Sequence, residues 1–401
     1  MLSIIKLSSA DLSQSQVRRK FVADPFVEGR SYVESYDRTT LWYDAFWRGG
    51  RVSLICPKLF NLLPLIRNAC IKLDGCVTPI SKVRQYRRYD TIELRSKRNP
   101  NQISIEGEGF AVNTPVGQDQ SHLFKGLNAH TTLNMNNNLR WISDFGSYMV
   151  KAQGLDAMLL FDNGSTDYAL EEVGTTLKRT GLKRIVIVSV PFKYGHRTQQ
   201  DSSRAKFLQT AMLNVARLRF LATARAVINS DFDELIWSRG GNVFDLTKKS
   251  ILGFSIFSGE WRFPDPQHPN QTIHAAHDHK LDKSELCPWK YCIVPQGRLK
   301  RLSWDVHRLS GLPFKKILRN TDIGFYHCHN TSTHWKGTPS RRGVPENNRD
   351  WTGHEFEFDS DARAALDLGL PAPSDHEMLL VNDIPKLSTS KTNKANRRDC
   401  I

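Results

Sequence analysis

The chain has 401 residues, enough for two or three domains, and 39% of them are hydrophobic and 10% aromatic, which excludes a chain that is disordered throughout. The 56 lysines and arginines outnumber the 41 aspartates and glutamates, so the formal net charge is +15 and anionic partners are favoured: nucleic acid, phosphorylated small molecules or acidic lipid surfaces. Because the basic residues are spread along the chain, a generally basic soluble protein is the alternative interpretation.

The first twenty residues lack both a long apolar core and a small-residue cleavage pattern, so they do not predict a secretory signal. No stretch reaches the ~18–20 apolar residues that span a bilayer. The seven cysteines are an odd number without framework spacing, which is typical of free thiols in a reducing compartment. We therefore expect a cytoplasmic protein, whose basic surface allows a peripheral contact with the inner face of the membrane.

Residues 1–125 predict a β-rich domain in which we find no catalytic motif. The segments KVRQYRRYDTIELRS and NQISIEGEGFAV alternate in part between polar and apolar residues and are bounded by turn-forming residues. RVSLICPKLFNLLPLI adds a short apolar run bounded by Gly and Pro. No helix of useful length is predicted in this part.

From about residue 129 the sequence alternates between strand and helix patterns. Short apolar or β-branched runs predict four strands, at residues 130–135, 157–161, 184–190 and 224–230. Apolar side chains at helical spacing or helix-end signals predict three helices between them, at residues 139–154, from 167 to about 181, and within 203–219. This order predicts an α/β domain with a mostly parallel sheet flanked by helices.

We therefore expect four parts along the chain. They are a β-rich domain at 1–125, the α/β domain at 126–340, a C-terminal extension at 341–384 and a disordered basic tail at 385–401.

Two acidic loops directly follow predicted strands. DNGSTD occupies 162–167, and DFDE occupies 231–234. Because ligands of parallel sheets bind beyond the carboxyl ends of the strands, we expect both loops at the same, ligand-binding edge.

Asp231 and Asp233 flank Phe232 at the end of an apolar strand. In an extended segment residues i and i+2 point the same way, so both carboxylates could bind one hard cation such as Mg²⁺ or Mn²⁺ while Phe232 faces the core. An isolated D-x-D is more often a solvated turn or a helix cap. The position after a strand and opposite a second acidic loop favours the metal site.

In the other loop, the Asp162 carboxylate could accept hydrogen bonds from a ribose or a base edge, and Ser165 and Thr166 could cap the next helix. An ordinary strand-to-helix loop with a good cap is the alternative. A calcium loop of the EF-hand type does not fit the spacing.

FDNGSTD followed by NSDFDEL resembles the GT-A glycosyltransferases, in particular the branch near family 2 and family 92. The resemblance covers about 130–335, from TTLNMNNNLRWISDFGSYMVKAQGLDAMLLFDN to PWKYCIVP, WDVH and GFYHCHN. It implies a GT-A fold and metal-dependent transfer of a sugar from a nucleotide-sugar donor, first of all a UDP-sugar. The acceptor would be a glycan, a glycolipid or other lipid-linked acceptor, or a polysaccharide.

The resemblance also implies roles for single residues. Asp162, with Asn163 beside it, would contact the nucleotide, and Asp231 and Asp233 would bind Mn²⁺ or Mg²⁺ with Glu234 in support. One histidine would complete the metal shell, and the candidates in order of preference are His307, then His327 or His329. The family's acidic residue after the opening strand is absent here, where the sequence reads Asn136, Asn137 and Asn138, so donor contacts at these positions are not carried over.

Inverting transfer needs a carboxylate that deprotonates the acceptor hydroxyl. Glu260 is the first candidate because its neighbour Trp261 could stack on a sugar. Asp265, Asp278 and Asp305 compete with it, and a retaining mechanism would not need this base.

Cationic and sulfur-bearing side chains allow further interpretations. Lys290, Arg298, Lys300 and Arg301 could contact donor phosphates or an anionic acceptor, or form a solvated basic face. Zinc is a rival metal, although the spacing is poor, with the candidate ligands Cys287, Cys292, His327, Cys328 and His329.

Two other functions compete with the transferase. A non-catalytic carbohydrate- or nucleotide-binding protein on a GT-A scaffold is the first, and the retained Asp231, Asp233 and Glu234 argue against it. A nucleic-acid-binding protein is the second. Zinc-finger and RNP-like motifs and aromatic interleaving of the basic residues are missing, so we expect no nucleic-acid partner.

Overall fold

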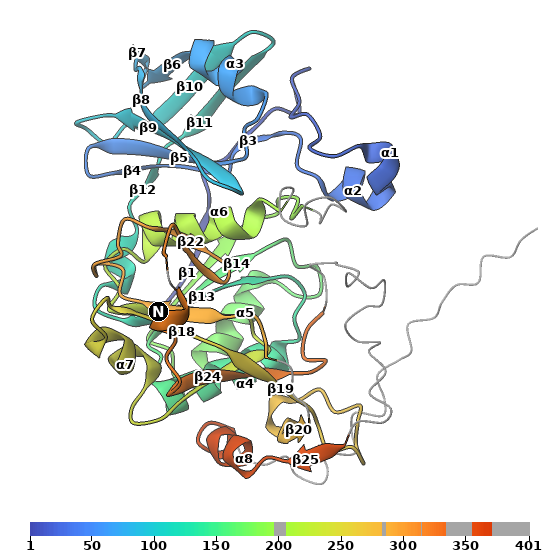
Figure 1. The fold of residues 1–401 in the computed structure, drawn as a ribbon. Coiled ribbons are helices and arrows are strands. Elements are labelled where there is room, and N and C mark those ends of the chain that lie inside the picture. Colours follow the sequence, from blue (N-terminus) through green and yellow to red (C-terminus); the bar gives the residue numbers. More distant parts are fainter. Residues whose placement is uncertain (196–205, 283–285, 314, 334–354, 371–401) are drawn as a thin grey trace, which may run out of the picture.

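The computed structural model describes residues 1–195, 206–282, 286–313, 315–333 and 355–370. The chain is a mixed α/β structure whose largest sheet has mostly parallel strands (Figure 1). The predicted tail at 385–401 and most of the extension at 341–384 lie outside the described residues. The described part of the extension contains strand β25 (Phe356–Phe358) and helix α8 (Ser360–Asp367).

The largest sheet has seven strands in the order β1-β15-β14-β13-β16-β21-β18. In that order their bounds are Leu2–Lys6, Arg184–Ser189, Ala157–Asp162, Asn128–Asn134, Ala226–Asn229, Lys290–Ile293 and Phe254–Phe257. The first five strands are parallel, and β21 runs antiparallel to both of its neighbours. The four predicted strands are confirmed as β13, β14, β15 and β16, and so is the mostly parallel sheet.

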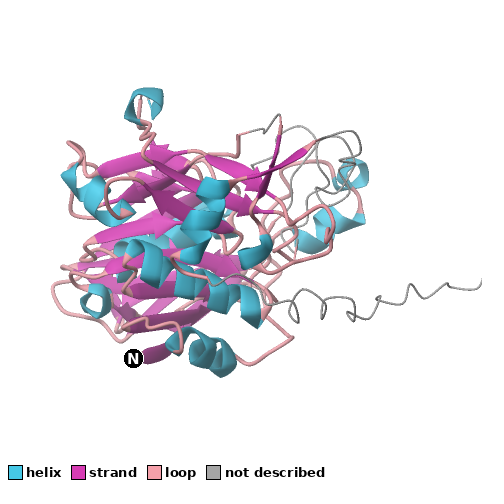
Figure 2. Cartoon of the chain, turned by 90° about the horizontal axis from the view of Figure 1, so that it is seen from below, coloured by secondary structure: helices cyan, strands magenta, loops and turns pink. Residues whose placement is uncertain are grey.

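Helices flank this sheet, and Figure 2 shows them packed against its strands. The three predicted helices are confirmed as α4 (Leu139–Gln153), α5 (Leu170–Lys178) and α6 (Leu208–Val215), which continues into the π-helix η2 (Ala216–Phe220). Asn138 caps α4 by accepting a hydrogen bond from the Arg140 amide, and Gly154, with φ of 65°, ends it. Among the described residues, none of the helices has both the length and the apolar character needed to cross a membrane.

The N-terminal part is rich in strands, as predicted, and forms two main sheets with the orders β11-β10-β6-β7 and β12-β4-β5-β9-β8. Its strands are β2 (Ala10–Asp11), β3 (Thr40–Trp42), β4 (Asp44–Arg48), β5 (Arg51–Pro57), β6 (Cys70–Leu73), β7 (Cys76–Val77), β8 (Ile80–Gln85), β9 (Tyr89–Arg95), β10 (Gln102–Gly107), β11 (Phe110–Pro115) and β12 (Gly117–Gln118). Its helices are short: α1 (Pro25–Glu28), α2 (Arg30–Ser35), α3 (Leu62–Asn68) and the 3₁₀ turn η1 (Ser121–Phe124).

Strand β1 departs from the predicted division at residue 125. Although it opens the chain, it is the edge strand of the seven-stranded sheet and pairs in parallel with β15, from Leu2 opposite Ile185 to Lys6 opposite Ser189. Its first side chain packs so closely on α5 that a β-carbon at Gly174 would lie 2.5 Å from Leu2. The remaining N-terminal sheets are thus connected to the α/β part at both of their ends.

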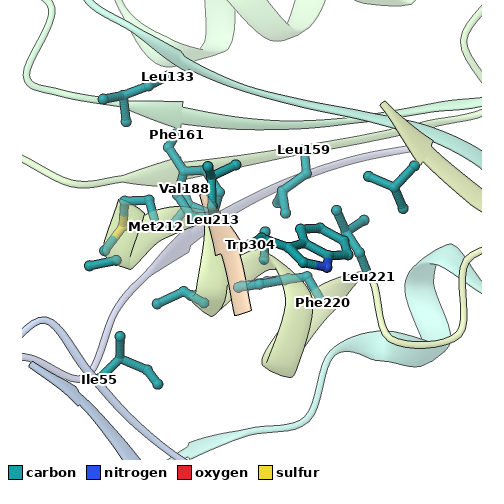
Figure 3. Packing of buried hydrophobic residues seen from close by; sticks show 14 of the residues in the cluster. Ile55, Leu133, Leu159, Phe161, Val188, Met212, Leu213, Phe220, Leu221 and Trp304 are labelled. Carbon is teal, nitrogen blue, oxygen red and sulfur yellow. The ribbon is translucent and has the colours of Figure 1, made fainter. Parts of the chain in front are cut away.

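The two parts share a hydrophobic core, in which Ile55 of β5 packs with residues of α6, η2 and the parallel sheet. Figure 3 shows Trp304 beside Phe220 and Leu221, with Ile55 on the side of the N-terminal sheets. A buried ion pair also joins the parts, because Arg219 of η2 donates to both carboxylate oxygens of Asp44, at 2.8 and 2.9 Å.

The remaining elements follow the second acidic loop in the chain. A three-stranded sheet has the order β17-β24-β19, with bounds Glu234–Ser238, Ile323–Cys328 and Gly259–Arg262. The other elements are α7 (Val243–Lys249), η3 (His274–Ala276), β20 (His279–Leu281), β22 (Ser303–Asp305), β23 (Arg308–Ser310) and η4 (Lys315–Leu318).

Candidate metal centre

Both acidic loops lie at the carboxyl edge of the parallel strands, as predicted. Asn134, Asp162 and Ser189 are aligned across the ends of β13, β14 and β15. On the other side of β13, β16 ends at Asn229 and leads directly into the DFDE segment.

The DFDE segment is a tight turn between β16 and β17, not the extended segment that the sequence suggested. The Glu234 amide donates to the Asp231 carbonyl at 3.2 Å, and the Asp231 amide donates to the Glu234 carboxylate at 2.8 Å. Phe232 is buried, as expected, against Phe145 at a ring-centroid distance of 5.3 Å. Because the chain turns here, the carboxylates of Asp231 and Asp233 have different partners.

Asp231 is paired with a buried lysine. Lys290 is the first residue of β21. Its ammonium nitrogen lies 3.0 Å from the Asp231 carboxylate and 2.7 Å from the Glu234 carboxylate. Lys290 is only 1% exposed. Burial alone would lower its pKa, but the two carboxylates outweigh burial and raise it above the ordinary value of a lysine. The lysine is therefore a fixed positive charge beneath the turn.

Asp233, Glu234 and His327 form a second group, which shares Glu234 with the Lys290 ion pairs and in which one ligand atom from each residue lies within 4.8 Å of the others. The antiparallel register of β17 and β24 sets Glu234 opposite His327, and Asp233 Oδ2 lies 3.3 Å from His327 Nε2. Both contacts of Glu234 with Lys290 and the Asp231 amide use Oε2, which leaves its second oxygen for another partner. We call these three residues the metal cluster.

Two observations fit a divalent cation in the metal cluster. Asp233 Oδ1 is buried and has no hydrogen-bond partner in the described part of the chain. An unsatisfied buried carboxylate oxygen is costly, and a cation would satisfy it. Two carboxylates and one imidazole are also a donor set that suits Mn²⁺ and other first-row divalent ions.

The His327 imidazole is held on both sides. Trp261 of β19 stacks on it, with ring centroids 3.9 Å apart and an interplanar angle of 13°. The Cys287 thiol interacts with the same imidazole. Burial acts to lower the pKa of His327, but the adjacent Asp233 carboxylate outweighs it and raises the pKa well above the ordinary value. The Asp233 carboxylate therefore favours the positively charged form of this imidazole when no cation is bound.

Of the three histidines proposed as the third ligand, His327 is the one in the metal cluster. His307, the first choice, lies at the exposed turn between β22 and β23, where Nδ1 is 3.0 Å from the Trp289 carbonyl oxygen. His329 lies next to Phe263, at a ring-centroid distance of 5.1 Å, and its carbonyl accepts from His277. Within the described residues the geometry thus favours His327 as the third ligand, although electrostatic interactions with Lys290 and Asp231 place His307 near the D-x-D segment.

Glu260 does not face the metal cluster. Side chains alternate along a strand, and Trp261 is the β19 residue whose ring stacks on His327. Glu260 points to the other side, where Arg262 donates to it at 3.0 Å. The competing aspartates also have partners: Asp265 accepts from the Gln267 amide, Asp278 contacts His279 and Arg363, and Asp305 accepts from Thr210.

The DNGSTD loop is held by its own hydrogen bonds. Asp162 is 2% exposed, and its carboxylate accepts from the Asn134 amide group, the Gly164 and Ser165 backbone amides and the Ser165 hydroxyl, at 2.6 to 3.1 Å. Asn163 donates to the carbonyls of Val190 and Phe192. The side chains of Asp162 and Asn163, which were predicted to contact the nucleotide, thus form hydrogen bonds that stabilise the loop.

Of the predicted zinc ligands, Cys287 and His327 lie together, but within the described part of the chain they form no group of three ligands other than the metal cluster, which His327 shares with two carboxylates. Cys292 is fully buried in β21, and burial raises the pKa of its thiol to about 12. A thiol held in its protonated form is a poor zinc ligand.

No known protein family matches the chain, and no similar protein is found among curated proteins. The arrangement of Asp233, Glu234 and His327 at the sheet edge is therefore the observation on which a function can be built.

Proposed function

We propose that the chain is a metal-dependent glycosyltransferase with a GT-A fold, which uses a nucleotide-sugar donor, with a UDP-sugar preferred, and a glycan or lipid-linked acceptor. The observation that carries the proposal is the metal cluster at the carboxyl edge of a mostly parallel sheet, the edge at which such sheets bind ligands. The DNGSTD loop after β14 carries the other part of the resemblance to this family and lies at the same edge.

Asp233, Glu234 and His327 would hold Mn²⁺ or Mg²⁺, and the bound ion would neutralise the charge that develops on a diphosphate leaving group. Lys290 forms ion pairs with Asp231 and Glu234 and so links both ends of the turn to β21. Trp261 orients the His327 imidazole.

The partly exposed Trp261 also offers an aromatic surface beside the metal cluster, and aromatic rings are suited to pack against the apolar face of a sugar. Glu260 lies on the other face of β19, so the proposal assigns it no role as a base.

A non-catalytic binding protein is the second candidate, and one observation favours it. The ion pair with Lys290 occupies Asp231, the first carboxylate of the D-x-D segment. A scaffold that binds a nucleotide but no longer transfers sugar could tolerate this loss.

The two functions are separated by measuring hydrolysis and transfer from a panel of UDP- and GDP-sugars with and without Mn²⁺. We expect turnover of at least one UDP-sugar that depends on Mn²⁺ and falls on the order of 100-fold in Asp233→Asn and in the double variant Asp231→Ala, Asp233→Ala. The matched control is Asp322→Asn, an exposed carboxylate just before β24, which should keep full activity.

Nucleotide binding without turnover in the wild type would favour the binding protein. Full activity in Asp233→Asn would refute the metal role of the cluster.

A further inference from the structure

A cavity of about 520 Å³ lies between the five-stranded N-terminal sheet and the α/β part. Strands β5, β8 and β9 form one wall, and residues 217–218 and 300–301 form the other. The two walls belong to the upper and lower parts of the molecule in Figure 1.

The sheet wall is one face of β5, β9 and β8, as the register shows. Ser53 and Lys82 are both aligned with Glu93, and Ile55 and Arg84 are both aligned with Thr91. Since side chains alternate along a strand, these six residues lie on the same face of the sheet. The intervening residues, such as Val52, Leu54 and Ile92, are buried in the N-terminal core on the other face.

The charge of this cavity is strongly one-sided. Among the described residues, one carboxylate, that of Glu93, lines it together with six cationic side chains: Arg51, Lys82, Arg84, Arg217, Lys300 and Arg301. Glu93 lies 3.2 Å from Arg51 and 3.5 Å from Arg84. Like charges that face each other across a cleft repel, so an anion that enters would relieve this repulsion.

Parts of the lining are held in place before any ligand binds. Arg217 donates to the Asn214 side chain at 3.1 Å and to the Lys300 carbonyl at 3.4 Å. Tyr86 is stacked on Tyr89, with centroids 4.5 Å apart and an interplanar angle of 2°, and the Tyr89 hydroxyl is 2.7 Å from that of Ser303. A preformed wall loses less conformational entropy on binding.

The cavity is separate from the metal cluster. Strand β21 starts with Lys290 at the carboxyl edge of the sheet and, being antiparallel to β16, leads towards the opposite edge before Lys300 and Arg301 follow. Arg217 belongs to η2, which precedes β16 and so lies towards that same opposite edge.

We propose that this cavity is a second binding site, for a molecule that carries two or more phosphate or sulfate groups. Its volume falls within the roughly 300–1,000 Å³ of typical small-molecule sites. Arginine and lysine side chains supply the charge-assisted hydrogen bonds that such oxyanions accept, and the Tyr86 ring can pack on the molecule's carbon skeleton. This site stands whether or not the chain is a transferase.

The test is calorimetric titration of the full chain with inositol hexakisphosphate at about 150 mM salt, where long-range attraction is largely screened. We expect one molecule per chain. The triple variant Lys82→Ala, Lys300→Ala, Arg301→Ala removes three exposed cations that have no ion-pair partner among the described residues, so the fold should be retained. Affinity should fall roughly tenfold or more.

The matched control is Lys178→Ala, Arg179→Ala, Lys248→Ala, which removes three exposed cations on α5 and α7, outside the cavity. Both variants lower the net charge from +15 to +12, so general attraction falls equally. The control should bind within about twofold of the wild type. Equal weakening in both variants, or no binding by the wild type, would overturn the proposal.

Vesicles that carry a bisphosphorylated inositol lipid form a second arm of the experiment. Binding of both probes, lost in the cavity variant, supports a site that also takes a membrane-borne headgroup. Binding of the free probe alone supports a site for a soluble ligand.

Discussion

The two acidic loops leave strands on either side of β13 at the same sheet edge, but their carboxylates behave differently. Asp162 accepts four hydrogen bonds from its own loop and from Asn134. Asp233, in the other loop, keeps one buried oxygen without a hydrogen-bond partner in the described chain and directs the other at His327. The carboxylate of the first loop is satisfied within the chain, whereas the second loop keeps an unsatisfied carboxylate oxygen that the proposed cation would satisfy.

A carboxylate that follows a strand can stabilise the fold or be available to a ligand. Which of the two roles it has depends on whether its oxygens already accept hydrogen bonds within the chain. A stabilising carboxylate should affect unfolding and leave metal affinity unchanged. A binding carboxylate should do the reverse.

Replacing Lys290 with Met should have the largest effect, because it leaves the carboxylates of Asp231 and the buried Glu234 without their cation. We expect a loss of about 3–5 kcal/mol in the free energy of unfolding, measured with urea and circular dichroism. Adding Glu234→Gln to this variant should restore more than half of the loss, since one unpaired charge is removed. A decrease of less than about 1 kcal/mol in the free energy of unfolding would show that the ion pairs of Lys290 do not stabilise the turn.

Asp233→Asn should weaken Mn²⁺ binding on the order of 100-fold, which corresponds to about 2.7 kcal/mol, because the cluster loses a charged ligand. The stability of the metal-free protein should change by less than about 1 kcal/mol. Calorimetric titration with Mn²⁺ and urea unfolding give the two quantities. Unchanged Mn²⁺ affinity would remove Asp233 from the metal site.

Asp162→Ala should show the opposite profile. Four donors lose their acceptor, so we expect a loss of about 2–3 kcal/mol in the free energy of unfolding, with Mn²⁺ affinity within about twofold of the wild type. Asp167→Ala, an exposed carboxylate of the same loop, is the control and should cost less than about 0.5 kcal/mol. A large loss of Mn²⁺ affinity in Asp162→Ala would erase the contrast between the loops.

Trp261→Ala should have the smallest effect, because it removes the ring that orients His327 but none of the three ligands. Aromatic stacking contributes about 0.5–1.5 kcal/mol, so Mn²⁺ affinity should fall by about 3- to 10-fold. Trp261→Phe keeps a stacking ring and should retain most of the affinity. Equal losses in both variants would show that stacking is not what positions the histidine.

The sequence predicted the parallel sheet and the edge that carries both acidic loops, because these depend on local patterns. The apolar runs that became β14, β15 and β16 needed no knowledge of distant residues, and the end of each run located an acidic loop. Residue Phe232 was also predicted correctly to be buried, since it directly follows such a run.

All three residues of the metal cluster were candidates in the sequence, but the choice of His327 among the histidines could not be made, because it depends on contacts between distant segments. His327 meets Glu234 only through the pairing of β24 with β17, which joins residues far apart in the chain. The side to which Glu260 points depends on the phase of β19, and a four-residue strand gives too little alternation to determine it. The tight turn at Asp231 is likewise set by Lys290, which lies on another strand.

The placement of β1 has a consequence for how the chain can be shortened. Because residues 2–6 cover the edge of β15, a chain that begins at residue 126 would carry the predicted α/β domain with that strand uncovered. The row of free amide and carbonyl groups would then be available to a neighbouring molecule, which is the usual start of strand-to-strand aggregation. Such a shortened chain would also lose Ile55, Tyr89 and Phe124 from the shared core, so we expect it to precipitate and a peptide with the sequence LSIIK not to rescue it alone.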